Sequence, residues 1–186
     1  MAWHLETSKQ IKTNIMKKVS IALIALFITS QVSAQTNEDV TKKNSWLKAG
    51  ISASIPVGDI SNYSSFAAGL ELSGQFMKTT HFGIGITSGY TEFFAKNNAT
   101  SFGAIPIGLM LRYYPEYKGF FIGTDLGYTA LTNLSNSSGG FYIKPQLGYH
   151  NYDWNLFAFY NDVFTGSGNI DVKNAGIAAT YNIRFK

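Results

Sequence analysis

WLKAGISASIPVG, residues 46–58, alternates apolar and polar side chains along its length. From Leu47 to Val57 every second residue is apolar, and the residues between them are lysine, glycine, serine or proline. Successive side chains of a β-strand point to opposite faces, so a period of two indicates a strand. The segment therefore predicts a strand that separates an apolar environment from a polar one.

The same alternation recurs through the rest of the chain. Seven further segments show it, at 65–76, 82–90, 104–113, 120–128, 141–149, 154–164 and 177–185. Segment 154–164 is apolar on both faces, so the sequence leaves open which of its faces points inward. Eight strands predict an all-β domain over residues 46–186.

The links between these segments alternate in length. Short links at 78–81, 115–119 and 151–153 alternate with longer polar links at 59–64, 95–101, 132–139 and 165–170. Outer-membrane barrels have short periplasmic turns, longer external loops and both chain ends inside. The pattern predicts an eight-stranded antiparallel up-and-down transmembrane β-barrel.

The composition of the two stripes predicts which one faces outward. Glycine, serine, threonine and alanine dominate the polar stripe, and such small residues fit the crowded interior of a narrow barrel. A soluble, lipocalin-like carrier of a small apolar ligand is the alternative, and it would need a charged, solvated polar stripe. Aromatic residues gather near the strand ends, as in the two girdles of a membrane barrel. We expect outer-membrane lipid against the apolar stripe. The expected girdle residues are Trp46, Phe76, Phe82, Tyr113, Phe120, Tyr149, Trp154 and Phe185 at the short-turn end, and Phe66, Tyr90, Phe94, Tyr128 and Phe141 at the long-loop end.

The residues before the barrel resemble an export signal. Lys17 and Lys18 precede an apolar run from 19 to 28 and a small-residue ending at Ala34. This order predicts a signal peptide at 16–34, cleaved between Ala34 and Gln35. The apolar run is about ten residues long, and a membrane-spanning helix needs about twenty. We interpret 1–15 as an upstream extension and 35–45 as a flexible lead-in, and we expect the bacterial outer membrane as the location.

Charge and cysteine content exclude several functions. The net charge is +4, but from residue 35 onward eleven Lys and Arg face ten Asp and Glu. No basic stripe with interleaved aromatics remains, which argues against nucleic-acid binding. The absence of cysteine excludes disulfides, thiolate metal sites and a thiol nucleophile. No cofactor or metal site is expected.

Charged residues within the strands mostly share the polar stripe. Because an unpaired buried charge is unfavourable, we expect Glu71 and Asp125 to accept hydrogen bonds from lysine or arginine. Such a network would fill the lumen and argues against a general porin. Pro106 and Pro145 cannot donate to a sheet ladder, so we expect a bulge or a water-bonded carbonyl at each. The candidate interior charges are Lys48, Glu71, Arg112, Asp125, Lys144 and Arg184.

Two segments carry a family resemblance. IPIGLMLRYY at 105–114 resembles the I-P-L-x-L-K-Y-Y strand of the porin-like outer-membrane β-barrel family common in Bacteroidetes. The final strand, with Tyr181, Ile183 and Phe185 on one face, is similar to the signal read by the barrel-assembly machinery, although Lys186 follows the terminal aromatic. The resemblance covers residues 46–186 and implies a small barrel of the OmpA/OmpX type. That family shares no catalytic or ligand-binding motif.

The leading interpretation is a monomeric, non-enzymatic barrel whose external loops bind a surface partner, since binding usually resides on loops of a rigid scaffold. An outer-membrane lipid-modifying enzyme is a second hypothesis. It would need a Ser or His with an acid near the outer leaflet, whereas His81 and His150 fall in short turns. The loop candidates are Asn62, Tyr63, Asn97, Asn98, Asn133 and Asn136.

Overall fold

The computed structural model describes residues 46–79, 81–96, 99–134, 138–166 and 169–184. The expected extension (1–15), signal peptide (16–34), Ala34–Gln35 cleavage site and lead-in (35–45) lie outside these residues. The same is true of Phe185 and of the loop candidates Asn97, Asn98 and Asn136. Within the described part of the chain, no helix is long and apolar enough to cross a membrane.

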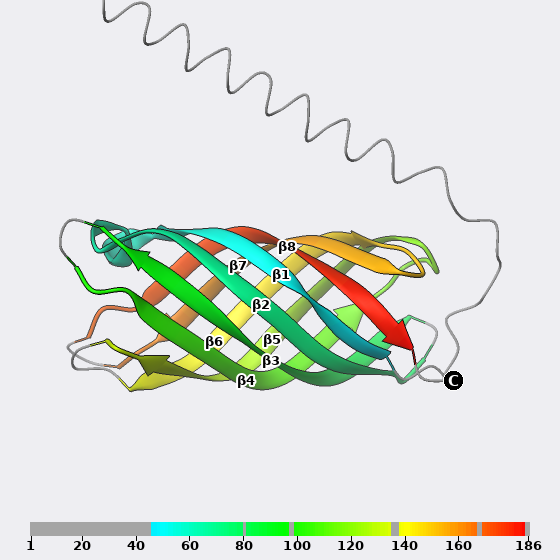
Figure 1. Cartoon of the computed structure of the whole chain (residues 1–186). Helices are drawn as coiled ribbons and strands as arrows, with labels where there is room; N and C mark the ends of the chain where they lie inside the picture. Colours follow the sequence, from blue (N-terminus) through cyan, green and yellow to red (C-terminus); the bar gives the residue numbers. More distant parts are fainter. Residues whose placement is uncertain (1–45, 80, 97–98, 135–137, 167–168, 185–186) are drawn as a thin grey trace, which may run out of the picture. The chain divides into compact units, whose positions relative to one another are not determined.

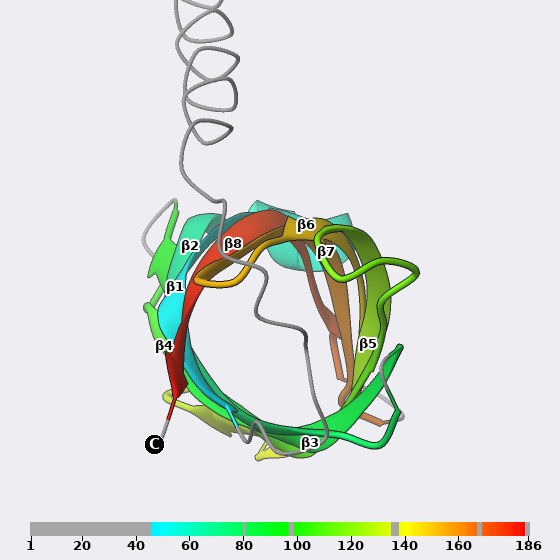
Figure 2. The ribbon, with the colours of Figure 1, turned by 90° about the vertical axis from the view of Figure 1, so that its right-hand side faces the viewer.

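Eight antiparallel strands form a closed barrel (Figures 1 and 2). Each strand pairs with its neighbours in sequence, and the last strand pairs with the first along the whole length of the first. Closure leaves no free sheet edge. The predicted eight-stranded antiparallel up-and-down barrel is confirmed. The strands are β1 (Trp46–Val57), β2 (Ser64–Met77), β3 (Phe82–Ala95), β4 (Phe102–Tyr113), β5 (Gly119–Thr132), β6 (Gly139–His150), β7 (Trp154–Phe164) and β8 (Val172–Arg184).

The links divide between the two ends of the barrel as expected. The strand ends joined by the short links 78–81, 114–118 and 151–153 lie at the end where β8 finishes, and those joined by the four longer links lie at the opposite end (Figure 1). We call these the short-turn end and the long-loop end. The first long link contains a short 3-10 helix, η1 (Gly58–Asn62), that the sequence pattern did not predict.

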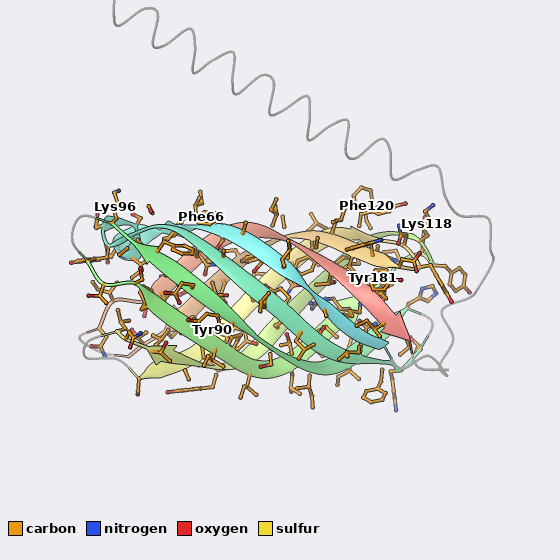
Figure 3. All side chains as sticks on the ribbon, in the orientation of Figure 1. Phe66, Tyr90, Lys96, Lys118, Phe120 and Tyr181 are labelled. Carbon is orange, nitrogen blue, oxygen red and sulfur yellow. The ribbon has the colours of Figure 1, made fainter. Side chains whose placement is uncertain are left out.

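The outward face is apolar, as expected for the predicted orientation. Ile51 and Ile107 are 65% and 63% exposed, while Ser52 and Thr87 on the other stripe are buried. Phe66, Tyr90, Phe120 and Tyr181 are also exposed, and Figure 3 shows their side chains on the barrel wall. This arrangement is the reverse of what a soluble ligand carrier needs, because most of the strand leucines and isoleucines lie outside. The structure also gives the orientation of β7, whose inward face carries Asn155, Phe157, Phe159 and Val163.

Neither proline lies at a bulge, and the other expectation, a water-bonded carbonyl, stays a prediction. Pairing continues in the same register on both sides of Pro106 and Pro145, so the ladder skips the missing donors without inserting a residue. The hydroxyl of Ser88 donates to the carbonyl oxygen of Pro106 at 3.0 Å. A register shift does occur between β2 and β3, at Ser64 and Phe66.

Candidate functional site in the barrel interior

Three strands contribute to a closed hydrogen-bonded triangle inside the barrel. Arg112 of β4 lies 2.8 Å from the carboxylate of Asp125 on β5, and their side chains are 7% and 3% exposed. Nη1 of Arg112 makes that contact, and Nη2 donates to Oε1 of Gln146 on β6 at 2.6 Å. Gln146 in turn donates from Nε2 to Asp125 Oδ2 at 2.6 Å. Both charges of the triangle, Arg112 and Asp125, are therefore paired and hydrogen-bonded, as a low-dielectric interior requires.

A second ion pair crosses the lumen. Lys144 of β6 donates from Nζ to both carboxylate oxygens of Glu71 on β2, at 2.7 and 2.8 Å. These two strands are not neighbours in the sheet, so the pair connects opposite walls. The Lys144 ammonium also lies 4.3 Å from the ring centroid of Phe159, within range of a cation–π interaction.

Lys48 of β1 belongs to a third group, nearer the short-turn end. Its Nζ donates to the hydroxyl of Tyr114 at 3.1 Å and to Oδ1 of Asn155 at 3.2 Å. The Tyr114 hydroxyl donates to Oε1 of Gln75 at 2.9 Å. Burial raises the pKa of Tyr114 to about 12, so this hydroxyl keeps its proton at neutral pH. The interior thus brings together five of the six predicted charges, while the side chain of Arg184, the last residue of β8, is outside the described set.

Two apolar layers fill the rest of the lumen. The sequence pattern did not predict them, because it indicated glycine, hydroxyl groups and paired ions there. A usable signal was present: Phe93-Phe94, Phe120-Phe121 and Phe141-Tyr142 are adjacent pairs, and in a strand one ring of each pair must point inward. The layer at the short-turn end comprises Met77, Tyr114, Phe121, Phe157, Phe159 and Ala178. The layer at the long-loop end comprises Ile60, Ala67, Phe93, Phe102, Ala104, Leu131, Tyr142, Val163 and Val172.

The long-loop layer includes the 3-10 helix that interrupts the first external link. Ile60 of η1 is buried in the same cluster as Phe93 and Phe102, whose rings stack at 4.6 Å between centroids. The first external link therefore folds inward and helps to close the mouth of the barrel. Interior cavities of about 30 and 20 Å³ remain between the side chains.

The two histidines of the barrel contact main-chain carbonyl groups of one turn. His81 Nδ1 lies 2.9 Å from the carbonyl oxygen of Tyr114, and His150 Nε2 lies 3.1 Å from that of Glu116. Both contacts position the link 114–118 at the short-turn end. Among the described residues, no group of three or more His, Asp or Glu side chains could hold a metal ion.

Those loop and assembly candidates that belong to the described residues lie on the surface. Asn62, Tyr63 and Asn133 are exposed at the long-loop end, and Asn133 adopts a left-handed backbone with φ of 60°. Tyr181 and Ile183 are exposed on the outward face of β8.

Comparisons with known proteins identify the fold. No protein-family model matches the chain, and no curated protein matches its sequence. The crystal structure of Neisserial surface protein A is similar, with a TM-score of 0.57 and 14% identity over 76% of this chain and 97% of that one. The outer membrane protein Ail of Yersinia pestis, determined in a phospholipid bilayer nanodisc, gives a TM-score of 0.51 and 12% identity over 75% of this chain and 99% of that one. At such identities the likeness concerns the fold, which is that of small outer-membrane eight-stranded barrels.

Proposed function

We propose that the chain is a non-enzymatic protein of the bacterial outer membrane, in which a sealed eight-stranded barrel anchors surface loops. The observation that carries this proposal is the combination of an apolar outward face with a filled lumen. Outward isoleucines and leucines match the lipid-facing band of an outer-membrane barrel. Ion pairs and the two apolar layers occupy the interior, so the barrel wall serves as an anchor and not as a conduit.

The long-loop end is the proposed interaction region. Loops on a rigid scaffold are where binding usually resides, and exposed Asn62, Tyr63 and Asn133 lie there. The contacts of His81 and His150 with main-chain carbonyls, at the opposite end, support a positioning role for both rings and not catalysis on outer-leaflet lipid. Membership of the porin-like family of Bacteroidetes and an OmpA/OmpX-type relationship remain part of the proposal, supported by the strand at 105–114.

Export, assembly and oligomeric state complete the proposal. Segment 16–34 would direct export and be removed after Ala34, before Gln35. Tyr181, Ile183 and Phe185 would present the assembly signal to the barrel-assembly machinery; the exposure of the first two on β8 supports this role. A closed sheet has no free edge to pair with another chain, which supports a monomer.

Fractionation combined with gel mobility tests the proposal. The full chain is expressed in a Gram-negative host, and membrane fractions are loaded with and without boiling. The expected product lies in the outer-membrane fraction and changes its mobility on boiling, because a membrane barrel resists SDS until it is heated. A mature product that stays in the soluble fraction and shows no mobility change would contradict the proposal.

The assembly signal has its own test. Tyr181→Ala with Phe185→Ala should reduce the heat-modifiable fraction, whereas Tyr63→Ala in an external link should leave it unchanged. Equal yields of folded barrel from both variants would remove the assembly role from the proposal.

A further inference from the structure

A chamber with both polar and apolar side chains in its wall lies inside the barrel, bounded by members of the two apolar layers. It is the cavity of about 30 Å³ described above, and its wall includes Glu71, Asp125, Thr129, Tyr142 and Lys144. The adjoining cavity of about 20 Å³ shares Glu71 and Asp125 with it. We call the larger cavity the central chamber.

One hydroxyl in the wall of the central chamber has no protein partner. Tyr142 of β6 is 1% exposed, and no described residue makes a hydrogen bond with its Oη. The hydroxyl reaches the position above Gly108 on β4, where an added Cβ would lie 2.6 Å from Oη. Buried hydroxyls in folded proteins nearly always have a partner, because leaving one without a hydrogen bond is unfavourable.

The size and lining of the central chamber select its occupant. A cavity of about 10–15 Å³ is enough for one water molecule, so this volume suits one or two and excludes organic ligands. The carboxylates of Glu71 and Asp125 are already paired with Lys144 and Arg112, which disfavours an additional cation. Charged and hydroxyl groups in the wall supply the two to four polar partners that a buried water needs.

We propose that the central chamber is a water site, in which one or two buried water molecules accept a hydrogen bond from Tyr142 Oη and link it to the polar groups of the wall. This water completes the interior network, which otherwise leaves one hydroxyl unsatisfied. Members of both apolar layers, Phe93 and Ala104 from one and Phe159 from the other, line the chamber, so the water lies within the folded structure.

Replacing Tyr142 by phenylalanine distinguishes a hydrated chamber from a dry one. In a dry chamber, Y142F removes an unsatisfied hydroxyl and the urea midpoint of the refolded barrel rises or stays unchanged. In a hydrated chamber, the same change deprives the water of a partner and the midpoint falls. Y128F is the matched control, because Tyr128 lies on the outward face of β5 and its loss should leave the midpoint nearly unchanged.

A crystal structure at a resolution that shows water provides the direct readout. The wild-type barrel should show density within hydrogen-bonding distance of Tyr142 Oη, and that density should be weaker or lost in Y142F. The proposal is overturned if Oη has no water neighbour and Y142F is as stable as the wild type or more stable.

Discussion

Arg112 and Asp125 illustrate how this barrel satisfies charge in a narrow interior. Their side chains are almost fully buried, and Gln146 bonds to both, so each of the three side chains is bonded to the other two. Removing one partner of a buried pair strands the other charge, whereas removing both does not. Each residue of the pair therefore contributes to stability mainly through its contact with the other.

Substitution of this pair should be strongly non-additive. Arg112→Met or Asp125→Leu alone is expected to lower the free energy of unfolding by about 3–5 kcal/mol, because each leaves an uncompensated buried charge. The double variant should lose much less than the sum of the two. Urea unfolding in detergent micelles measures all four proteins, and strictly additive losses would contradict the coupled network.

Tyr114 predicts a stability loss at high pH. Its pKa rises from 10.0 to about 12 on folding, mainly by burial, so between these values the unfolded chain releases the proton and the folded chain keeps it. The unfolded state binds fewer protons in this window, so stability falls as the pH rises. We expect the stability advantage of the wild type over Tyr114→Phe to shrink by about 2 kcal/mol between pH values of about 9.5 and 11.5, at about 1.4 kcal/mol per pH unit. A constant difference across this window would contradict the burial of this hydroxyl.

At the scale of the strands, glycine allows close contact between neighbours in the sheet. A Cβ added to Gly127 of β5 would lie 2.2 Å from the carbonyl oxygen of Ile107 on β4, whereas one added to Gly74 of β2 meets nothing within 4 Å. Gly127→Ala should therefore destabilise by about 1–3 kcal/mol through overpacking. Gly74→Ala is the control and should stay within about 0.5 kcal/mol of the wild type. Equal urea midpoints for the two variants would show that the β4–β5 contact is not tight.

The strands also show which parts of the fold the sequence predicts. Alternation from Leu47 to Val57 predicts a strand and its outward face, because a period of two has one structural meaning when one face is apolar. The start of β8 at Val172, and not at 177, escaped prediction because Lys173 and Asn174 weaken the apolar contrast there. The inward face of β7 escaped it because both of its faces carry apolar side chains.

The interior was less predictable than the strands. The polar stripe indicates that Glu71 and Lys144 share the lumen, but their contact depends on the barrel diameter and on the register of non-neighbouring strands. The inward folding of Ile60 depends on a short helix in a polar link, for which no periodic pattern exists. Local alternation fixes the face of a residue, whereas its partner across the lumen depends on closure of the whole sheet.

At the scale of the whole molecule, the filled lumen predicts an absence of conductance. The apolar layers at both ends and the ion pairs between them leave cavities of about 30 and 20 Å³. The refolded barrel in a planar lipid bilayer should show no resolved current steps, because ions would have to cross apolar layers that exclude water. Regular steps that scale with salt concentration would contradict the sealed interior.

In the proposed arrangement the apolar stripe faces lipid and the polar stripe faces the lumen. The chain has no cysteine, so a single cysteine can be placed at each of residues 51–55 of β1 and labelled with a nitroxide without a competing thiol. Accessibility to oxygen, which concentrates in the hydrocarbon of a bilayer, is then measured for each labelled barrel in lipid vesicles. We expect high accessibility at Ile51, Ala53 and Ile55 and low accessibility at Ser52 and Ser54. The opposite alternation, or none, would mean that the apolar stripe does not face lipid.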